Sequence, residues 1–325
     1  MQAMMIARAK ELLESGAVDR VLGWKAGEFV YDVTPAVFTS AEELDAGFVY
    51  DEFCGPNLSK YLISESRKGG KVLAFLKPCD TYSFNQLLKE HRILRENVYV
   101  IGVACEGKTD GEMLKAAGIK GITGIRSEGG SLVADTLYGE KTVKKADVLH
   151  ERCLCCKSKK HVVYDELIGE EGEPDPGCGR FDMVEKIEAM TADERFAFWR
   201  GELSRCIRCN ACRNVCPACS CEKCVFDNDA SGIAQKAAAD DFEENMFHII
   251  RAFHVAGRCT DCGECSRVCP QHIPLHLLNR KFIQDIDRFY GEYQAGEDTD
   301  SRAPLNTYST GDVEPSIVYE KGGNR

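Results

Sequence analysis

Two cysteine runs with the same spacing constrain this chain more than any other feature. The first is Cys206-Ile-Arg-Cys-Asn-Ala-Cys-Arg-Asn-Val-Cys-Pro, and the second is Cys259-Thr-Asp-Cys-Gly-Glu-Cys-Ser-Arg-Val-Cys-Pro. Both have the pattern CxxCxxCxxxCP, in which three closely spaced thiolates wrap one 4Fe–4S cube. The fourth cysteine precedes a proline, points away and ligates the other cube where two are present. The sequence therefore predicts two 4Fe–4S clusters.

The same pattern predicts how the two cubes share their ligands. We expect the first cube to be held by Cys206, Cys209, Cys212 and Cys269. We expect the second cube to be held by Cys259, Cys262, Cys265 and Cys216. Zinc is the alternative metal, but structural zinc sites use pairs of CxxC rather than two evenly spaced quartets.

Composition describes the setting in which these clusters work. The chain has 325 residues, enough for two domains, with 44% hydrophobic and 29% charged residues, which is ordinary for a soluble protein. Its net charge of −11 argues against a nucleic-acid or anionic-membrane surface. No run approaches the ~18 apolar residues of a membrane span. Eighteen cysteines, eight of them predicted ligands, indicate a reducing compartment. We therefore expect a cytoplasmic protein of anaerobic metabolism.

The first half of the chain alternates apolar runs with helical patterns. Residues 71–76 and 98–103 are predicted to be buried strands, and this rhythm is typical of an α/β fold with a parallel sheet. Cys54, Cys79 and Cys105 each follow a predicted strand, at the edge where open α/β sheets bind ligands. The three thiols could line one pocket, or they could be small buried side chains. Cys79 is the first candidate for a pocket role.

A third group of cysteines follows the predicted α/β sheet. It consists of Cys153, Cys155, Cys156 and Cys178. Glycine and proline flank this group, which suits a third metal site, and we predict a third 4Fe–4S cluster with zinc as the alternative. Neighbouring cysteines rarely both reach one metal, so whether all four bind is left open.

The second half of the chain is predicted to be mainly helical. Apolar residues recur on one helix face in residues 242–253 and 277–286, on either side of the second cysteine run. We therefore expect an α/β domain at 1–180, a helical dicluster domain at 181–290 and an extended arm at 291–325. Three further cysteines could complete another site, support the third group or have no ligand role: Cys219, Cys221 and Cys224.

Several short stretches resemble a known family. They are Lys77-Pro-Cys-Asp, Ile101-Gly-Val-Ala-Cys-Glu-Gly, residues 152–156, residues 164–168 and the two cysteine runs. Together they resemble the beta subunits of deazaflavin-reducing hydrogenases and dehydrogenases, and the related sulfhydrogenase beta subunits. The second run with its flanks is similar to the helical ferredoxin part of heterodisulfide reductase and succinate dehydrogenase subunits. The resemblance covers the chain to about residue 288. It departs from the deazaflavin family in domain order, because the ferredoxin module comes last here.

The resemblance implies a flavin, FAD, in the α/β part and exchange of electrons with a soluble carrier such as a deazaflavin, NAD(P)H or ferredoxin. No GxGxxG fingerprint supports the flavin independently. The residues placed by the resemblance in a cofactor pocket are Lys77, Cys79, Asp80 and Glu106. No catalytic residue is predicted.

We therefore expect an oxidoreductase subunit that passes electrons between that carrier and a partner subunit. The partner would belong to a heterodisulfide reductase-like, hydrogenase or formate dehydrogenase complex. One alternative is a non-catalytic iron–sulfur wire and docking subunit without flavin. Another is a scaffold that delivers clusters, which two tightly formed quartets disfavour.

Overall fold

The computed structural model describes residues 1–157, 159–173, 179–228 and 241–306. Its first part is built on a five-stranded sheet with the strand order β2-β1-β3-β4-β8. The strands are β1 Arg20–Ala26, β2 Val33–Phe38, β3 Val72–Leu76, β4 Val98–Val103 and β8 Glu166–Ile168. β1, β3, β4 and β8 are parallel, and β2 is antiparallel at one edge. The predicted α/β fold is confirmed.

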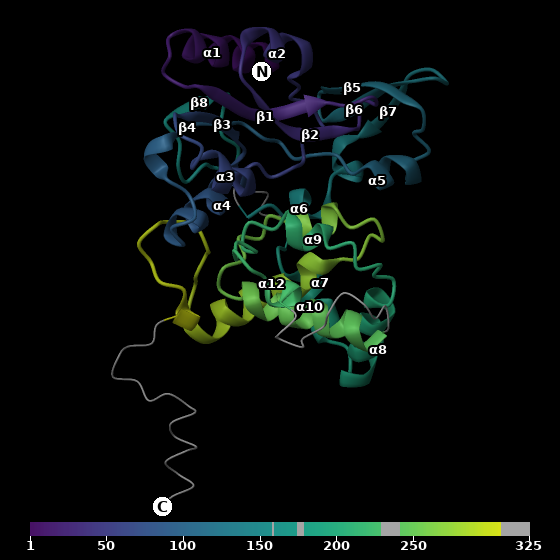
Figure 1. Cartoon of the computed structure of the whole chain (residues 1–325). Coiled ribbons are helices and arrows are strands. Elements are labelled where there is room, and N and C mark those ends of the chain that lie inside the picture. Colours follow the sequence, from purple (N-terminus) through teal and green to yellow (C-terminus); the bar gives the residue numbers. More distant parts are fainter. Residues whose placement is uncertain (158, 174–178, 229–240, 307–325) are drawn as a thin grey trace, which may run out of the picture.

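Helices cover both faces of this sheet (Figure 1). One face carries α1 Gln2–Glu14 and α2 Ala41–Gly47, and the other carries α3 Leu62–Glu65 and α4 Pro78–Lys89. β3 is buried at all its positions because it lies in the middle of the sheet between the two layers. The core joins apolar residues of α1, the central strands and α4. The sheet therefore holds the carboxyl ends of β3 and β4 at one rigid edge.

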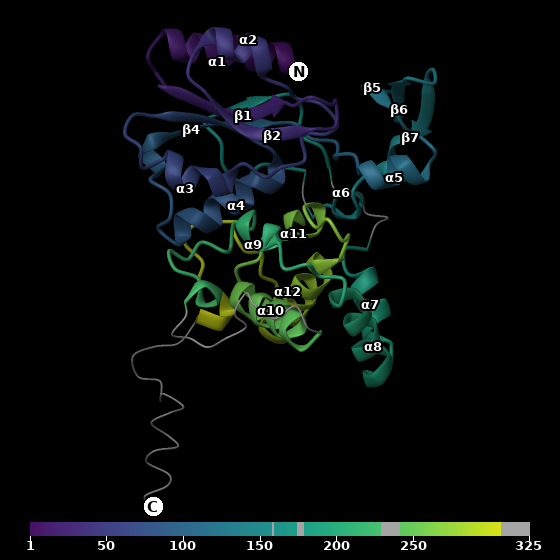
Figure 2. The same ribbon diagram turned by 45° about the vertical axis from the view of Figure 1, so that its right-hand side comes forward.

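A smaller sheet stands beside the main one (Figure 2). It is an antiparallel meander of β5 Ile122–Glu128, β6 Ser131–Thr136 and β7 Lys141–Lys144. α5 Gly111–Ala116 accompanies it, and Leu114 of α5 packs with Leu132 and Ala134 of β6. This lobe has its own small core and borders a large cavity described below.

The second part of the chain is mainly helical, as predicted. Its helices are α7 Asp182–Glu188, α8 Ala192–Leu203, α9 Ala211–Asn214, α10 Asp241–Val255, α11 Glu264–Arg267 and α12 Leu275–Tyr290; α6 Glu151–Leu154 precedes β8. Short 3₁₀ helices span Ser59–Tyr61, Arg95–Asn97, Lys145–Val148, Val225–Asp227 and Pro304–Asn306. Leu203, Phe247 and Leu275 bring α8, α10 and α12 into one apolar cluster that also contains ligand cysteines. The predicted boundaries at residues 180 and 290 stay predictions.

Buried polar contacts join the two parts. The Glu264 carboxylate of α11 accepts hydrogen bonds from Arg152 Nη1 at 2.7 Å and from the Asn57 backbone N–H at 3.1 Å. The hydroxyls of Ser83 and Thr260 lie 2.9 Å apart across the same junction. Buried charges are stable only when they are paired and hydrogen-bonded, so these contacts favour one relative placement of the two parts. The cysteine groups of both parts are thereby held in fixed positions.

The beginning of the predicted C-terminal arm packs against α4. Asn85 donates to the Glu297 carbonyl at 3.5 Å, and Lys89 donates to Ser301 Oγ at 3.0 Å. Gly296 has a φ of +76°, and a Cβ there would lie 1.8 Å from the Tyr82 carbonyl oxygen, so only glycine fits. Residues 307–325 of the arm lie outside the described residues.

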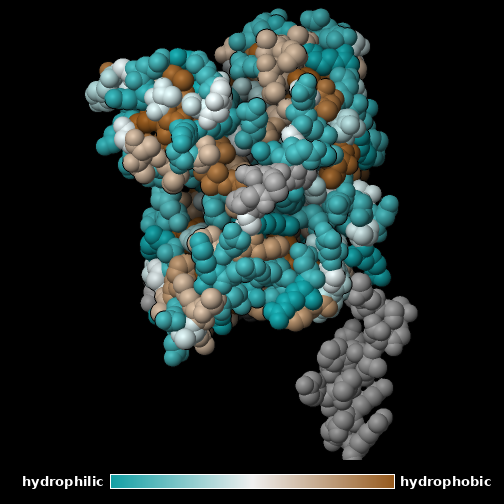
Figure 3. All heavy atoms as spheres, turned by 180° about the vertical axis from the view of Figure 1, so that it is seen from behind, coloured by the Kyte–Doolittle hydropathy of each residue, from teal (hydrophilic) through white to brown (hydrophobic). Residues whose placement is uncertain are grey.

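None of the helices in the described residues is long and apolar enough to cross a bilayer. Seen from behind, polar and charged side chains cover most of the face, and apolar side chains form separate patches (Figure 3).

Candidate metal centres and cofactor cavity

The two cysteine runs fold into two copies of one loop. In the first run Arg208 and Asn210 have positive φ, and in the second Asp261 and Gly263 have positive φ at the matching positions. Each loop then enters a one-turn helix, α9 or α11, at the same point. Left-handed residues turn the backbone tightly, and the Arg208 N–H points to Cys206 Sγ at 3.4 Å. The repeat seen in the sequence is therefore a repeat of three-dimensional structure.

The first set of predicted ligands meets in one small enclosed cavity. This cavity is lined by Cys206, Cys209 and Cys212 of the first run and by Cys269 from the end of the second run. The apolar walls are provided by Phe247 and other side chains of the helical core. We call the predicted sharing, in which each cube takes its fourth ligand from the other run, the crossed assignment. The structure thus brings together the four thiols that this assignment gives to one cube, while the assignment itself stays a prediction.

The second set gathers around Cys216. Burial raises the pKa of Cys259 to about 12 and raises those of Cys262 and Cys265, and in all three the nearby Cys216 thiolate adds to the increase. Cys216 therefore lies beside the trio of the second run rather than only beside its own run. Because a cluster ligand must be a thiolate, iron binding has to displace protons from these buried thiols.

The separation of the thiols fits cubes better than zinc ions. A tetrahedral zinc with Zn–S bonds of about 2.3 Å brings its sulfurs within ~4 Å of one another. Among the described residues, one group of three metal-binding side chains lies within 4.8 Å of one another: Cys206, Glu244 and His248. That group contains a predicted cube ligand, so we assign no separate ion to it. The other cysteine sets are wider, as a cube of four irons requires.

His248 of α10 should tune the cube held by Cys206. Its Nε2 lies 3.3 Å from Cys206 Sγ, and burial lowers the pKa of His248 to about 3, so the neutral ring can donate to the thiolate. Hydrogen bonds to cluster sulfurs stabilise the reduced, more negative state. We expect His248→Phe to lower the reduction potential of this cube by roughly 40 mV. This figure takes ~1 kcal/mol for the lost hydrogen bond and about 59 mV per 1.4 kcal/mol for a one-electron couple. Redox titration monitored by electron paramagnetic resonance checks this, with the second cube as internal control. An unchanged potential for the first cube would contradict the assignment.

A third set of cysteines meets where the two parts of the chain touch. One enclosed cavity is lined by Cys79, Cys105, Cys153 and Cys156, together with Cys262 of the second run. Cys79 follows β3 and Cys105 follows β4, so the parallel pairing of these neighbouring strands places both at one sheet edge. Cys153 lies on α6, and its Sγ accepts the Lys108 N–H at 3.4 Å.

This set differs in two members from the predicted third group. Cys155 is disulfide-bonded, and Cys178 lies outside the described residues. Cys79 was predicted to line a flavin pocket, and Cys105 was left open between a pocket role and a buried side chain; the structure places both in this cavity. The signal was present in the sequence, because both cysteines directly follow buried strands. Cys54, the third thiol after a predicted strand, is buried away from this cavity, with its Sγ 3.5 Å from the Val49 carbonyl.

The residues predicted for a flavin are placed outside the large cavity described next. Lys77 is buried, with its Nζ 2.9 Å from Asp80 and 2.8 Å from the Pro56 carbonyl. Glu106 is exposed and pairs with Lys145 at 3.1 Å. Lys77 and Cys79 line the cysteine cavity instead. Their cofactor role stays a prediction, and the geometry of Lys77 and Asp80 is that of a buried ion pair that supports the sheet edge.

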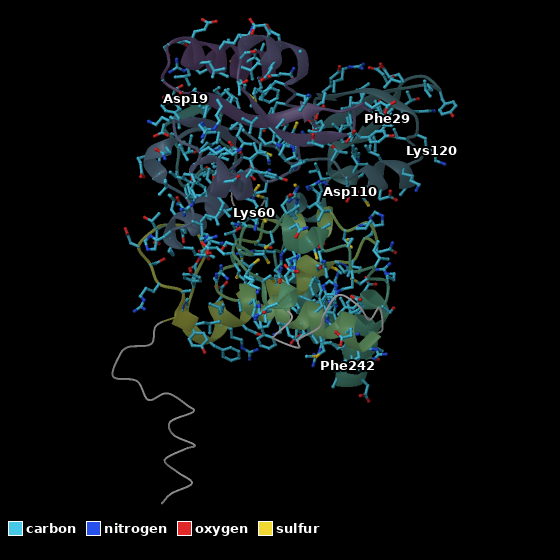
Figure 4. All side chains as sticks on the ribbon, in the orientation of Figure 1. Asp19, Phe29, Lys60, Asp110, Lys120 and Phe242 are labelled. Atoms are coloured by element: carbon cyan, nitrogen blue, oxygen red, sulfur yellow. The ribbon has the colours of Figure 1, made fainter. Side chains whose placement is uncertain are left out.

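A large cavity of about 640 Å³ lies between the small lobe, the main sheet and the second cysteine loop. Its walls include the rings of Tyr31 and Phe53 and several cations and imidazoles: Lys115, Lys120, His150, Arg152, Arg267 and His272. Asp110 and Lys120, which precede and follow α5 and are labelled in Figure 4, both line it. Thr109 Oγ1 is buried in its wall and has no hydrogen-bond partner within the described part of the chain. Sequence reasoning missed this cavity, because its lining comes from distant segments.

The chain is similar to several known proteins. Residues 202–273 match the family model of the 4Fe-4S dicluster domain. The chain is 26% identical to the F420-dependent formate dehydrogenase subunit beta of Methanocaldococcus jannaschii, over 83% of this chain and 85% of the relative. It is 28% identical to the F420-dependent formate dehydrogenase 1 subunit beta of Methanococcus maripaludis, over 91% of each. A chain of the F420-reducing [NiFe] hydrogenase complex of Methanosarcina barkeri superposes on 47% of this chain and 58% of its own length, with a TM-score of 0.39 and 17% identity.

The paired cysteine loops on a helical domain, attached to an α/β domain, define an iron–sulfur electron-transfer subunit of an oxidoreductase. In sequence the chain is similar to the beta subunits of F420-dependent formate dehydrogenases, and it contains a 4Fe–4S dicluster domain.

Proposed function

We propose that this chain passes electrons between a soluble deazaflavin carrier such as F420 and a partner subunit of a cytoplasmic formate dehydrogenase or hydrogenase complex. One observation supports this most strongly. The cavity of Cys79, Cys105, Cys153 and Cys156 adjoins both the large cavity and the second cysteine loop. It shares Arg152 with the large cavity, and Cys262 of the second run lines it. The proposed carrier sites are therefore neighbours in the fold.

The four thiols at the junction fit a third 4Fe–4S cluster. They line one enclosed space, and four cationic side chains line it with them: Lys77, Lys108, Arg152 and Lys157. A thiolate-ligated cluster is an anion, and nearby cations stabilise it where water is excluded. Lys77 and Lys108 are themselves held, because their ammonium groups lie over the rings of Trp24 at 4.4 Å and Tyr50 at 4.0 Å.

The large cavity fits a flavin nucleotide. Its volume lies in the range of cofactor sites, and aromatic walls with a few polar groups are typical of them. Lys115 and Lys120 could bind a pyrophosphate, and the unsatisfied Thr109 hydroxyl could hydrogen-bond to a polar atom of the flavin ring. A flavin bound there would supply the chemistry that couples a two-electron donor to one-electron carriers. The protein would orient the ring and shield it from water. The alternative, a non-catalytic iron–sulfur subunit without flavin, assigns no role to this cavity.

Cofactor content tests this proposal. Anaerobically purified chain should contain about one flavin per chain, read from its absorption spectrum after release. Lys115→Glu combined with Lys120→Glu should weaken flavin binding at least about tenfold, or ~1.4 kcal/mol, because it replaces cations near the phosphates by anions. Iron content should not change. Lys141→Glu on the exposed strand β7 is the matched control. A fully iron-loaded chain that contains and binds no flavin would support the wire instead.

A further inference from the structure

Three of the cysteines that none of the sites above uses lie close together. Cys219, Cys221 and Cys224 follow the first cysteine run, lie within a segment of six residues, and line one cavity of about 340 Å³. This cavity lies at the surface of the helical part, and Cys221 is exposed in it while Cys219 and Cys224 are half-buried. We infer that these three thiols hold a further iron–sulfur centre, which neither the dicluster domain nor the junction site requires.

The segment that carries these thiols is anchored at both ends. At its start the Cys219 N–H donates to the Cys216 carbonyl at 3.1 Å. At its end Phe226 is buried and packs against Phe247 of α10, with ring centroids 4.7 Å apart. Arg213 of α9 also pairs with Asp227 at 2.9 Å. The three thiols therefore stand in fixed places around the cavity.

The charges around the cavity favour an anionic occupant. Its lining contains the two carboxylates Glu222 and Asp227 and the four cations Lys60, Arg213, Arg251 and Arg258. Arg213 pairs with Asp227 and Arg258 pairs with Glu90, which leaves Lys60 and Arg251 as the excess among the described residues. Lys60 comes from the α/β part and lies at the boundary of the two parts (Figure 4). Its ammonium group donates to the Cys216 carbonyl at 3.1 Å and also contacts the Cys219 carbonyl. A cluster bound by three thiolates carries negative charge and would balance this excess.

A second observation is the side chain of Arg251, which also donates to the carbonyl of the predicted cube ligand Cys212 at 3.4 Å. It is only 3% exposed, lines the cavity, and its Nε has no acceptor among the described residues. A buried guanidinium N–H without a partner is costly, so a missing acceptor is expected nearby. The sulfurs of an iron–sulfur cluster would provide such an acceptor.

The spacing of the thiols favours a cluster over a single zinc ion. Among the described residues, no three metal-binding side chains of this cavity have their ligand atoms within 4.8 Å of one another, whereas a tetrahedral zinc needs sulfurs within ~4 Å. The same holds for the four thiols of the predicted cube of Cys206, Cys209, Cys212 and Cys269. Because Cys219 adjoins Cys216, a ligand of the second cube, the inferred centre would give that cube an outlet to the protein surface.

Iron and acid-labile sulfide per chain test the inference in the full-length, anaerobically loaded protein. Cys221→Ser and Cys224→Ser should each lose about four irons relative to the parent chain, together with one paramagnetic signal after reduction. The signals of the dicluster cubes and of the junction cluster should persist, so this outcome is separate from the proposed function. Cys54→Ser, at a buried cysteine outside all these cavities, should keep the full iron content. Unchanged iron in both variants would overturn the inference, and so would stoichiometric zinc that both variants lose.

Alkylation provides a measurement that does not depend on the folding of a variant. Exposed thiols react rapidly with iodoacetamide when they are free, and metal ligands are protected. In the iron-loaded parent chain, mass spectrometry should show that Cys221 is not alkylated. Cys221 should react once the iron has been removed by a chelator. Modification of Cys221 in chains that retain all their iron would overturn the inference.

Discussion

A Cys216→Ser chain is expected to lose the cube of the second run, although Cys216 belongs to the first. Burial and the Cys216 thiolate together raise the pKa values of Cys259, Cys262 and Cys265, which places Cys216 within their group. Serine is a much weaker iron ligand, so about four irons should be lost or that cube should become labile. The cube of Cys206, Cys209 and Cys212 should remain. Iron analysis with electron paramagnetic resonance distinguishes the two cubes.

The reciprocal variant makes this test decisive. Cys269→Ser should damage the cube of the first run, because Cys269 lines the cavity of Cys206, Cys209 and Cys212. If each serine variant instead damaged the cube of its own run, the crossed assignment would be wrong. Circular dichroism should show intact helices in both variants, since one thiol is replaced by a slightly smaller hydroxyl.

A Cys79→Ser chain is expected to lose the junction cluster and to keep both cubes of the dicluster region. The reason is that Cys79 shares one enclosed cavity with Cys105, Cys153 and Cys156. About four irons should be lost. Transfer of electrons from the reduced carrier to the dicluster cubes should fall by orders of magnitude in the same chain, measured by stopped-flow absorption.

Cys155→Ser is the matched control for this prediction. It adjoins Cys156 in the sequence, but the structure places Cys155 in a disulfide and outside the cavity. It should keep the junction cluster. The contrary outcome is that Cys155→Ser loses the junction cluster and Cys79→Ser keeps it. That result would support the ligand set predicted from the sequence and contradict the set of Cys79, Cys105, Cys153 and Cys156.

The sequence could predict every feature that depends on neighbouring residues. The ligands of each cube loop lie within eleven residues, so their spacing alone specifies the loop and the kind of cluster. The strands β3 and β4 were predictable because a parallel strand buried on both faces is a continuous apolar run. The helical nature of the second half followed from the period of its apolar residues.

Features made by distant residues were beyond that reasoning. Cys79 and Cys105 are joined to Cys153 and Cys156 by strand order and by the position of α6. The large cavity combines residues from Tyr31 to His276, and its cations have no common spacing. Glu106 followed a strand like a pocket residue, yet its side chain turns outward to Lys145.

The sequence by itself thus determined that the chain binds two cubes in a helical domain behind an α/β domain, because short loops encode their own ligand geometry. Only the tertiary structure decided which thiols meet at the junction of the two parts and where a flavin could bind. The physical reason is that strand pairing and the buried contacts of Glu264 with Arg152 and Asn57 bring together side chains that no local spacing relates.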